Sequence, residues 1–427
     1  MQLQTILNRV QRHRSFVYRE ARFRDGSDGL ALDVTIEPRA NGRPVCSGCG
    51  KRRPGYDPLP ARRFQFVPLW GIAVFFVYAL RRVDCPACGV KAEQVPWASG
   101  KEQLTTTYQW FLARWARRLP WQEVADVFRA SWNTVYRAVT LAVLWGIANR
   151  SLEGITAVGI DEIQWRKGHK YLTLVYQIQD GCKRLLYVAA DRTAESLRGF
   201  FAMLGKARSA ALEFACSDMW KPYLAVIAEC AGRAVHVLDR YHVMAQMNKA
   251  IDEVRAAEAR RLKADGHEPV LKHSRWVLLK RPENLTEKQT AKLKELLRYN
   301  LKAVRAYLLR EEFQRFWEYR SPYWAGRFLR DWCAKAMRSR IEPMKKVARM
   351  LRSHEGLLLN WFEAKGTVSA GSVEGLNYNA ELTMKKAYGF QTLRGVKIAL
   401  YHRLGALPEP LFAHEFCCGG GCPPGDA

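Results

Sequence analysis

The sequence predicts a multidomain α/β protein: a zinc-binding domain and a small helical domain, then an α/β domain divided by a long helical insertion. Three observations support this prediction. Two Cys-x-x-Cys-Gly motifs lie within the first 100 residues. Three short runs of β-forming residues follow residue 155, and helical and strand-like segments then alternate up to residue 239. Residues 240–360 are helical in pattern, basic and rich in tryptophan.

The charge of the chain is concentrated in two segments. The 427 residues carry a net charge of +27, and a hydrophobic content of 48% is typical of a globular protein. Residues 1–150 have 23 Lys and Arg against 11 Asp and Glu, and residues 240–360 have 28 against 14. Residues 151–239 and 361–427 net only +1 and 0. This distribution favours a polyanion such as DNA around a neutral centre, although charge alone also fits RNA or an acidic membrane.

The N-terminus and the longest apolar run predict a cytoplasmic protein. The first residues contain arginines but no apolar core of a signal peptide. The run Val67–Leu80 contains Pro68 and is shorter than the roughly 20 residues of a membrane-spanning helix. We therefore expect a cytoplasmic, nucleoid-associated protein without a membrane partner. In that compartment the 11 cysteines are expected to be thiols or metal ligands.

Four cysteines predict a structural Zn²⁺ site. Cys46 and Cys49 form one knuckle, and Cys85 and Cys88 form the other. Each pair of thiolates can hold one ion, and the following glycine permits a tight turn. The residues between the knuckles read as a β-hairpin that turns at Pro68–Gly71 and returns the chain to close the site. The alternative is a redox-active pair.

Three helices are predicted between residues 105 and 145. They cover Thr105–Arg118, Trp121–Arg129 and Trp132–Trp145. The last two, joined by a short turn, resemble a helix-turn-helix, although short helical triplets are common in helical proteins. The candidate DNA-binding residues near the start of the last helix are Asn133, Thr134, Tyr136 and Arg137.

The next segment has the element order of an RNase H-like domain. Strands are predicted at 157–163, 171–179, 184–190, 210–216 and 234–238, with helices at 193–206 and 219–230. Three consecutive strands followed by alternating helices and strands are typical of that fold.

Three acidic residues are candidate catalytic metal ligands. Asp161 interrupts the first apolar run, Asp218 follows the fourth strand, and Glu374 begins a later helical pattern. Carboxylates at strand ends and a helix start can hold two Mg²⁺ or Mn²⁺ ions, which act on a phosphodiester. For Asp161 alone, capping of a neighbouring helix is an equal alternative. Glu162 is excluded because adjacent strand residues face opposite sides of the sheet.

Further polar residues are expected to support this site. Asp239 follows the fifth strand, and His242 lies three residues later on the same helical face. We expect this pair to orient the metal ligands or to contact DNA, and we favour Asp218 over Asp239 as the second ligand. Lys385 and Lys386, beyond Glu374, are expected to meet phosphates.

The remaining features complete the domain plan. The tryptophans of residues 240–360 are mostly expected in a helical core, and the tail with Cys417, Cys418 and Cys422 is expected to be flexible. The predicted domains are 1–100 (zinc-binding), 101–150 (helix-turn-helix), 151–239 (first part of the α/β core), 240–360 (helical insertion), 361–410 (final helix region of the core) and 411–427 (tail).

Four segments resemble the bacterial insertion-sequence DDE transposases of the ISL-three group. They are GIDEIQWRKGHKYLTLV, DRTAESL at 191–197, VLDRYHV and SVEGLNYNAELTMKKAYGF. The resemblance implies an RNase H-like catalytic core with a helical insertion before the helix that bears the final Glu. It also implies metal-dependent cutting and joining of the element's ends.

The resemblance places Asp161, Asp218 and Glu374 on the acidic triad of that family. The Asp239-x-x-His242 signature is similar to one shared with hAT-like and Mutator-like transposases. The implied partners are the terminal inverted repeats, target DNA and a second copy of the chain. Two alternatives remain: a non-catalytic DNA-binding regulator and a host nuclease such as a resolvase.

Overall fold

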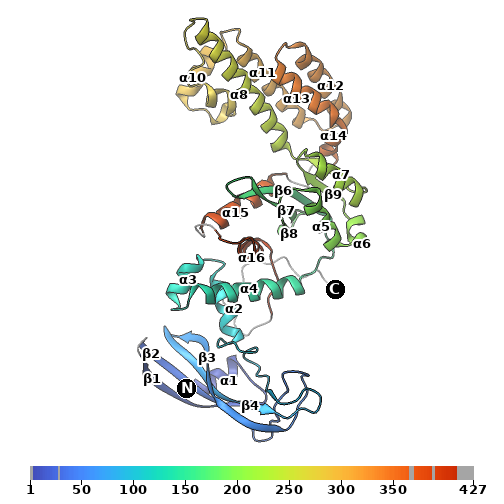
Figure 1. Ribbon diagram of the computed structural model, residues 1–427. Helices are drawn as coiled ribbons and strands as arrows, with labels where there is room; N and C mark the ends of the chain where they lie inside the picture. Colours follow the sequence, from blue (N-terminus) through green and yellow to red (C-terminus); the bar gives the residue numbers. More distant parts are fainter. Residues whose placement is uncertain (1–2, 27–28, 365–369, 387–389, 411–427) are drawn as a thin grey trace. The chain divides into compact units, whose positions relative to one another are not determined.

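The computed structural model describes residues 3–26, 29–364, 370–386 and 390–410 (Figure 1). The predicted flexible tail, 411–427, lies outside these residues. The chain forms two compact units. The first unit contains the described residues up to Ser151 and those from Leu382 onward, and the second contains the described part of Leu152–Glu381.

The first unit opens with helix α1 (Leu3–Val10) and a five-stranded sheet. The strands are β1 (Phe16–Gly26), β2 (Gly29–Pro38), β3 (Gly55–Leu69), β4 (Ile72–Val83) and β5 (Lys91–Ala92). Their order is β1-β2-β4-β3, and β5 pairs with β4. The buried Trp97 ring anchors the core, because it contacts Phe16 and Tyr78 edge-on at 4.9 and 5.3 Å between ring centroids.

The predicted hairpin between the cysteine pairs is confirmed. Strands β3 and β4 are antiparallel, and Leu69 pairs with Ile72 across the turn. The two turn residues, Trp70 and Gly71, have φ values of 51° and 79°. Positive φ at both positions matches the right-handed twist of the two strands. The hairpin therefore returns the chain toward the first cysteine pair.

The three predicted helices are also present in the first unit. They are α2 (Thr106–Trp115), α3 (Trp121–Val127) and α4 (Trp132–Asn149). The side-chain oxygen of Thr105 accepts a hydrogen bond from the backbone N–H of Tyr108, and that of Ser131 accepts from Thr134. These caps satisfy free N–H groups at the start of α2 and α4 and so define where each helix begins.

A helix from the end of the chain packs along α4. This helix is α16 (Leu393–Leu404), and a Cβ at Gly146 on α4 would lie only 2.6 Å from Leu407 just beyond it. Arg114 of α2 forms an ion pair of 2.7 Å with Glu409. Residues 390–410 thus pack with the N-terminal helices, whereas the sequence analysis grouped them with the α/β core.

The second unit contains a five-stranded mixed sheet in the order β10-β9-β6-β7-β8. The strands are β6 (Ala157–Arg166), β7 (Lys170–Gln177), β8 (Arg184–Ala190), β9 (Phe214–Ser217) and β10 (Val235–Leu238). Strands β6, β7 and β8 are antiparallel neighbours, whereas β9 and β10 run parallel to β6. Helices α5 (Ala194–Leu204), α6 (Lys206–Ala210) and α7 (Lys221–Cys230) connect the later strands. This is the predicted order of elements.

The fourth strand is shorter than predicted. The expected strand 210–216 begins inside α6, and β9 covers only Phe214–Ser217. Gly205, with a φ of 87°, ends α5 and allows the chain to start a second short helix. Pairing with β6 starts only where Phe214 meets Ala157, so the strand begins there.

The helical insertion begins directly after β10 and has a core of its own. Its elements are α8 (Arg240–Ala264), α9 (Arg275–Leu279), η1 (Pro282–Asn284), α10 (Glu287–Leu296), α11 (Lys302–Gln314), η2 (Arg315–Glu318), α12 (Pro322–Arg338), α13 (Glu342–Ser353) and α14 (Glu355–Glu363). Figure 1 shows α8 and α14 as the two elements that join this bundle to the sheet. Asn360 on α14 donates a hydrogen bond of 2.9 Å to the carbonyl of His236 on β10. Helix α15 (Ala370–Lys386) follows.

The five tryptophans of this region divide between core and surface. Trp317 and Trp332 are buried, and Trp361 packs partly buried against the same core. Trp276 and Trp324 are more than half exposed. The predicted core role therefore holds for three of them. No helix among the described residues combines the length and apolarity that a membrane span requires.

Arg310 provides a test of how the insertion is stabilised. Its side chain is 2% exposed, and the guanidinium donates hydrogen bonds to Asn248 Oδ1, the Leu279 carbonyl and the Lys280 carbonyl at 2.9–3.2 Å. Arg310→Met leaves these acceptors without donors. We expect the free energy of unfolding to fall by about 3 kcal/mol, measured by urea denaturation and tryptophan fluorescence.

The matched control is Arg330→Met. Arg330 pairs with Glu355 at 2.6 Å, but its side chain is 57% exposed. Water therefore replaces the lost ion pair, and we expect a change below about 1 kcal/mol. Equal unfolding midpoints for the two variants would contradict the role assigned to Arg310.

Candidate functional site

Three aspartates lie at one edge of the second unit's sheet. Gly159 on β6 pairs with Cys216 on β9, so Asp161 lies level with Asp218, the residue that follows β9. Asp239 follows β10, and its backbone N–H donates to the carbonyl of Ser217 at 2.9 Å. The carboxyl ends of the parallel strands β9 and β10 thus bring two of these acids beside the first. All three residues are at most 9% exposed.

Helix α15 covers the Asp161 side of the sheet. Gly159 permits this close approach, because a Cβ there would lie 2.5 Å from Val373 Cγ2. One turn later, Asn377 Nδ2 donates to Asp161 Oδ2 at 2.5 Å, and the hydroxyl of Tyr176 donates to Asn377 Oδ1 at 2.9 Å. A residue more than 200 positions away in the sequence therefore fixes the orientation of the Asp161 carboxylate.

Glu374 lies on the same helix, between these two contacts, and its side chain is exposed. Burial raises the pKa of Asp239 to about 6, and the negative charges of Asp161 and Glu374 contribute to this shift. The structure thus brings Glu374 within electrostatic range of Asp239.

His242 lies between two of the aspartates. Its Nε2 atom is 3.7 Å from Asp161 Oδ1 and 3.9 Å from Asp239 Oδ2. Interaction with Asp161 raises the pKa of His242 to about 9, and the charges of Asp239 and Asp218 add to this effect. The imidazole is therefore positively charged at neutral pH and partly neutralises the acids.

Asp218 has a different partner. Its Oδ2 atom accepts from Arg192 Nη2 at 2.8 Å, and its Oδ1 accepts from the backbone N–H of Trp220 at 3.0 Å. The other Arg192 nitrogen, Nη1, pairs with Glu162 Oε1 at 2.8 Å. The guanidinium also stacks on the Trp220 ring, 4.6 Å from its centroid. Arg192 therefore joins Asp218 to Glu162.

Glu162 faces the side of the sheet opposite Asp161, as predicted. It pairs across strands with Thr173, whose hydroxyl hydrogen-bonds to Tyr223 of α7 at 2.8 Å. Burial, together with the nearby negative charge of Asp218, raises the pKa of Glu162 to about 7. Its exclusion as a ligand of the Asp161 side fits this position, but its link to Asp218 through Arg192 was missed.

Three residues contact the acidic site in ways that were not predicted from the sequence: Glu162, Arg192 and Asn377. Arg192 lies inside the quoted DRTAESL segment, and Asn377 lies three residues after Glu374, on the same helical face. Both signals were readable from the sequence. No pattern in the sequence, however, shows which acid an arginine will pair with.

Four cysteines of the first unit lie close enough together to hold one metal ion. Among the described residues, Cys46, Cys49, Cys85 and Cys88 are the group whose ligand atoms all lie within 4.8 Å of one another. The Cys49 and Cys85 sulfurs are 3.7 Å apart, close to the roughly 3.8 Å that tetrahedral Zn–S bonds of about 2.3 Å require. The three predicted acidic ligands do not form such a group.

The glycine after each cysteine pair adopts the expected conformation. Gly50 and Gly89 have φ values of 68° and 69°. Their N–H groups donate to the carbonyls of Cys46 and Cys85 at 2.9 and 2.8 Å. Each knuckle thus turns back tightly, which points both sulfurs of a pair toward one position.

The four candidate DNA-binding residues of α4 differ in exposure. Asn133 and Arg137 are exposed, whereas Thr134 and Tyr136 are half-buried. Thr134 Oγ1 hydrogen-bonds to the hydroxyl of Ser131 at 2.9 Å. Only the first two are therefore free to reach an external partner from the helix surface. Lys385 and Lys386 are exposed in the last turn of α15.

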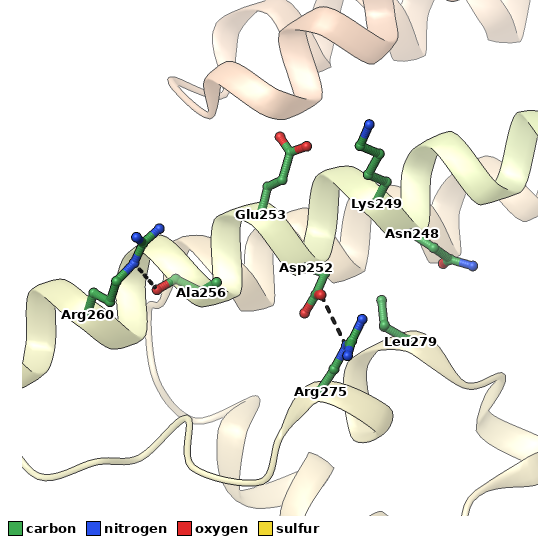
Figure 2. A pocket seen from close by; sticks show the side chains of 8 residues that line it. All are labelled: Asn248, Lys249, Asp252, Glu253, Ala256, Arg260, Arg275 and Leu279. Atoms are coloured by element: carbon green, nitrogen blue, oxygen red, sulfur yellow. Dashed lines mark hydrogen bonds and ion pairs between the residues drawn. The ribbon is translucent and has the colours of Figure 1, made fainter. Parts of the chain in front are cut away.

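A cleft of about 530 Å³ lies beside α8 and α9 in the insertion (Figure 2). Asp252 on its wall pairs with Arg275 at 3.1 Å and with Arg255 at 2.7 Å. Its walls also carry Glu253, Lys249 and Arg260. Acidic and basic groups alternate along this cleft, so it does not form a uniformly basic surface for DNA.

Comparison with known proteins identifies the family. A family model described as a transposase, of the ISL3 group of DDE transposases, matches residues 158–399. The transposase for insertion sequence element IS1001 of Bordetella parapertussis is 27% identical over 367 residues, covering 85% of this chain and 89% of that relative. The transposase for insertion sequence element IS1557 of Mycobacterium tuberculosis (strain CDC 1551 / Oshkosh) is 28% identical over 394 residues, covering 86% and 87%. The chain belongs to the ISL3 family of insertion-sequence transposases.

Proposed function

We propose that this transposase binds the terminal inverted repeats of its element and catalyses metal-dependent DNA cleavage and strand transfer. The observation that carries the proposal is the convergence of Asp161, Asp218 and Asp239 at one sheet edge, with the helix that bears Glu374 across it. The strand order β10-β9-β6-β7-β8 supports an RNase H-like core.

In this proposal Asp161, Asp218 and Glu374 hold two Mg²⁺ or Mn²⁺ ions. Carboxylate oxygens are the hard ligands that these ions prefer, so the donor set fits. Bound ions of this kind supply Lewis-acid stabilisation of charge at the attacked phosphodiester. Asn377 keeps the Asp161 carboxylate in a fixed orientation, and Asp218 must exchange Arg192 for an ion.

Asp239 and His242 have a supporting role. The charged imidazole of His242 bridges Asp161 and Asp239, which limits repulsion between the two carboxylates. It also offers a cation to a DNA phosphate. Lys385 and Lys386 offer two further cations for the DNA backbone.

DNA recognition is proposed for the first unit. Residues 1–150 carry a net charge of +12, and α3 and α4 have the spacing of a helix-turn-helix with Asn133 and Arg137 exposed. The four cysteines hold one structural Zn²⁺ that fixes the base of the hairpin. We further propose that the basic insertion shelters DNA ends and contributes to a dimer, because two ends must be held together.

The zinc site can be tested with Cys49→Ser. Loss of one thiolate from a four-cysteine site should remove the metal, because zinc affinity depends on the full ligand set. We expect about one zinc per chain in the unchanged protein and a loss of most of it in the variant, measured by elemental analysis. Cys230→Ser, outside the cluster, is the matched control and should retain zinc. Zinc-free unchanged protein would refute the assignment.

DNA recognition can be tested with Arg137→Ala in the full-length chain. The isolated fragment 1–150 is unsuitable because it lacks α16, which packs on α4. We expect about 1–3 kcal/mol weaker binding to inverted-repeat DNA and little change on random DNA, measured by fluorescence anisotropy. Asn133→Ala should act in the same direction.

The charge-matched control for Arg137→Ala is Arg233→Ala. Arg233 is an exposed arginine in the second unit, so its loss should leave the preference for repeat DNA unchanged. Equal affinity of the unchanged protein for repeat and random DNA would contradict the proposed recognition.

The catalytic assignment can be tested with amide substitutions. Asp161→Asn, Asp218→Asn and Glu374→Gln should each abolish cleavage and joining while DNA binding persists, because each removes a proposed metal ligand. Asp239→Asn should retain cleavage reduced about 10- to 100-fold, as expected for a group that orients ligands. Asp180→Asn, an exposed turn residue, is the control.

Gel-based cleavage and strand-transfer assays on DNA with the element's ends provide the measurement. The structure makes the comparison between Asp218 and Asp239 the informative one, because Asp218 pairs with Arg192 whereas Asp239 shares His242 with Asp161. An inactive Asp239→Asn together with an active Asp218→Asn would reverse the assignment.

A further inference from the structure

A second cavity, of about 790 Å³, lies within the first unit. It is enclosed by α3, α4, α16 and the last turn of α15. Its size is within the range of about 300–1,000 Å³ that is usual for small-molecule sites. Asn133 and Lys386, proposed above to contact DNA, are among its lining residues, but those roles do not explain a cavity of this size.

One wall of this cavity is aromatic. The rings of Trp132 and Tyr136 are stacked with an interplanar angle of 8° and a centroid distance of 5.4 Å. Trp121 contacts both of them at 5.8 and 5.9 Å and meets Phe390 edge-on at 5.5 Å. Four aromatic rings from three segments thus form a continuous surface. A planar ligand can stack on such a surface.

The rim of the cavity is basic. Arg118, Lys386, Arg394 and Arg403 line it and are exposed, and the described lining contains no carboxylate. Such a rim favours an anionic group next to the planar one. A purely apolar ligand would not need these cations, and a simple inorganic anion would not need the aromatic wall.

A buried hydrogen-bond acceptor without a partner lies in the wall of the cavity, shielded from solvent. His402 on α16 lines the cavity, is only 5% exposed, and its Nε2 atom has no hydrogen-bond partner. Burial, together with the nearby charge of Arg117, lowers the pKa of His402 to about 3, although a hydrogen bond of the ring to the backbone of Ala113 opposes this shift. The ring is therefore neutral, and Nε2 has a lone pair for an N–H donor. A buried acceptor without a partner costs about 1–3 kcal/mol, which a ligand can recover.

We propose that this cavity binds a single nucleobase that has left the DNA stack. The base stacks on the aromatic wall, and its flanking phosphates contact the basic rim. A small shift of the His402 ring toward the cavity lets its Nε2 atom accept an N–H from the base. This inference rests on the proposed DNA-binding function and adds a subsite to it. Tyr136, predicted from the sequence to read duplex DNA, here belongs to the wall that receives the base.

The test compares two single-stranded probes on the full-length, zinc-containing protein without added magnesium. One is a thymidine octamer with a central 2-aminopurine, and the other has an abasic analogue at that position. Base stacking on aromatic side chains contributes about 1–3 kcal/mol, so we expect the base-containing probe to bind roughly 10-fold tighter or more. Anisotropy gives both affinities, and a change in 2-aminopurine fluorescence on binding reports the altered stacking of that base.

Two variants should reduce this ratio toward one. His402→Leu removes the acceptor, and Trp132→Leu removes a stacking surface from a side chain that is 40% exposed and therefore tolerant of change. His267→Leu, at an exposed histidine of the insertion, is the matched control and should keep the ratio. Thermal unfolding by circular dichroism verifies that each variant is folded.

A third variant distinguishes the contribution of the basic rim to binding from that of the aromatic wall. Arg394→Ala should weaken both probes equally, with a shallower salt dependence, because it removes a phosphate contact and no base contact. Equal affinities of the unchanged protein for the two probes would overturn the proposal. So would an unchanged ratio in both His402→Leu and Trp132→Leu.

The comparison of base-containing and abasic probes tests the nucleobase site separately from the recognition of inverted-repeat duplex DNA. A protein that distinguishes base from abasic probes but not repeat from random duplex DNA would keep the nucleobase site and lose the proposed repeat recognition. The opposite result would retain repeat recognition and remove the nucleobase site.

Discussion

The dominant constraint in the second unit is the repulsion among four neighbouring carboxylates, three of them buried and one half-buried. Asp161, Glu162, Asp218 and Asp239 come from three adjacent strands and are at most partly exposed. Burial strengthens repulsion between like charges and disfavours ionisation, which explains the raised pKa values of Glu162 and Asp239. Such a cluster persists only if cations and hydrogen-bond donors surround it.

Three segments of the chain supply these compensating groups. Arg192 follows β8, His242 begins α8, and Asn377 comes from α15. In the sequence, Arg192 lies between β6 and β9, His242 lies directly after β10, and Asn377 lies far beyond all three strands. This requirement explains why α15 must return to the sheet although some 130 residues of insertion precede it. The insertion folds around a core of its own, so its length does not disturb the sheet.

Local patterns predicted the parts of the structure that depend on local physics. The hairpin at Trp70–Gly71, the two cysteine turns and the capped helices follow from residues close together in the sequence. The order of strands and helices along the chain, apart from the short α6, was also predicted, because β-forming runs and helical periods alternate clearly. The pairing of β6 with β9 places Asp161 beside Asp218, as the candidate site proposed from the sequence requires.

Features that depend on tertiary contacts were not predictable in this way. The start of β9 is set by its pairing with β6 and not by its own apolar run. The packing of α16 on α4 depends on a glycine that leaves space for a leucine 261 positions later. The pairing of Arg192 with Asp218 is likewise a choice among several acids that only the folded sheet presents.

The division of the acids between two cations bears on how the site can bind metal. His242 lies within ion-pair distance of Asp161 and Asp239, whereas Arg192 forms ion pairs with Asp218 and Glu162. If Asp161 and Asp218 held a divalent ion, as proposed above, the charge of that ion would replace Arg192 in neutralising Asp218. Arg192 would keep its contact with Glu162. Asp239 would need no metal, because His242 already provides it with a nearby positive charge. The distribution of cations in the fold thus favours Asp218 as the residue that changes partners and Asp239 as the one that does not.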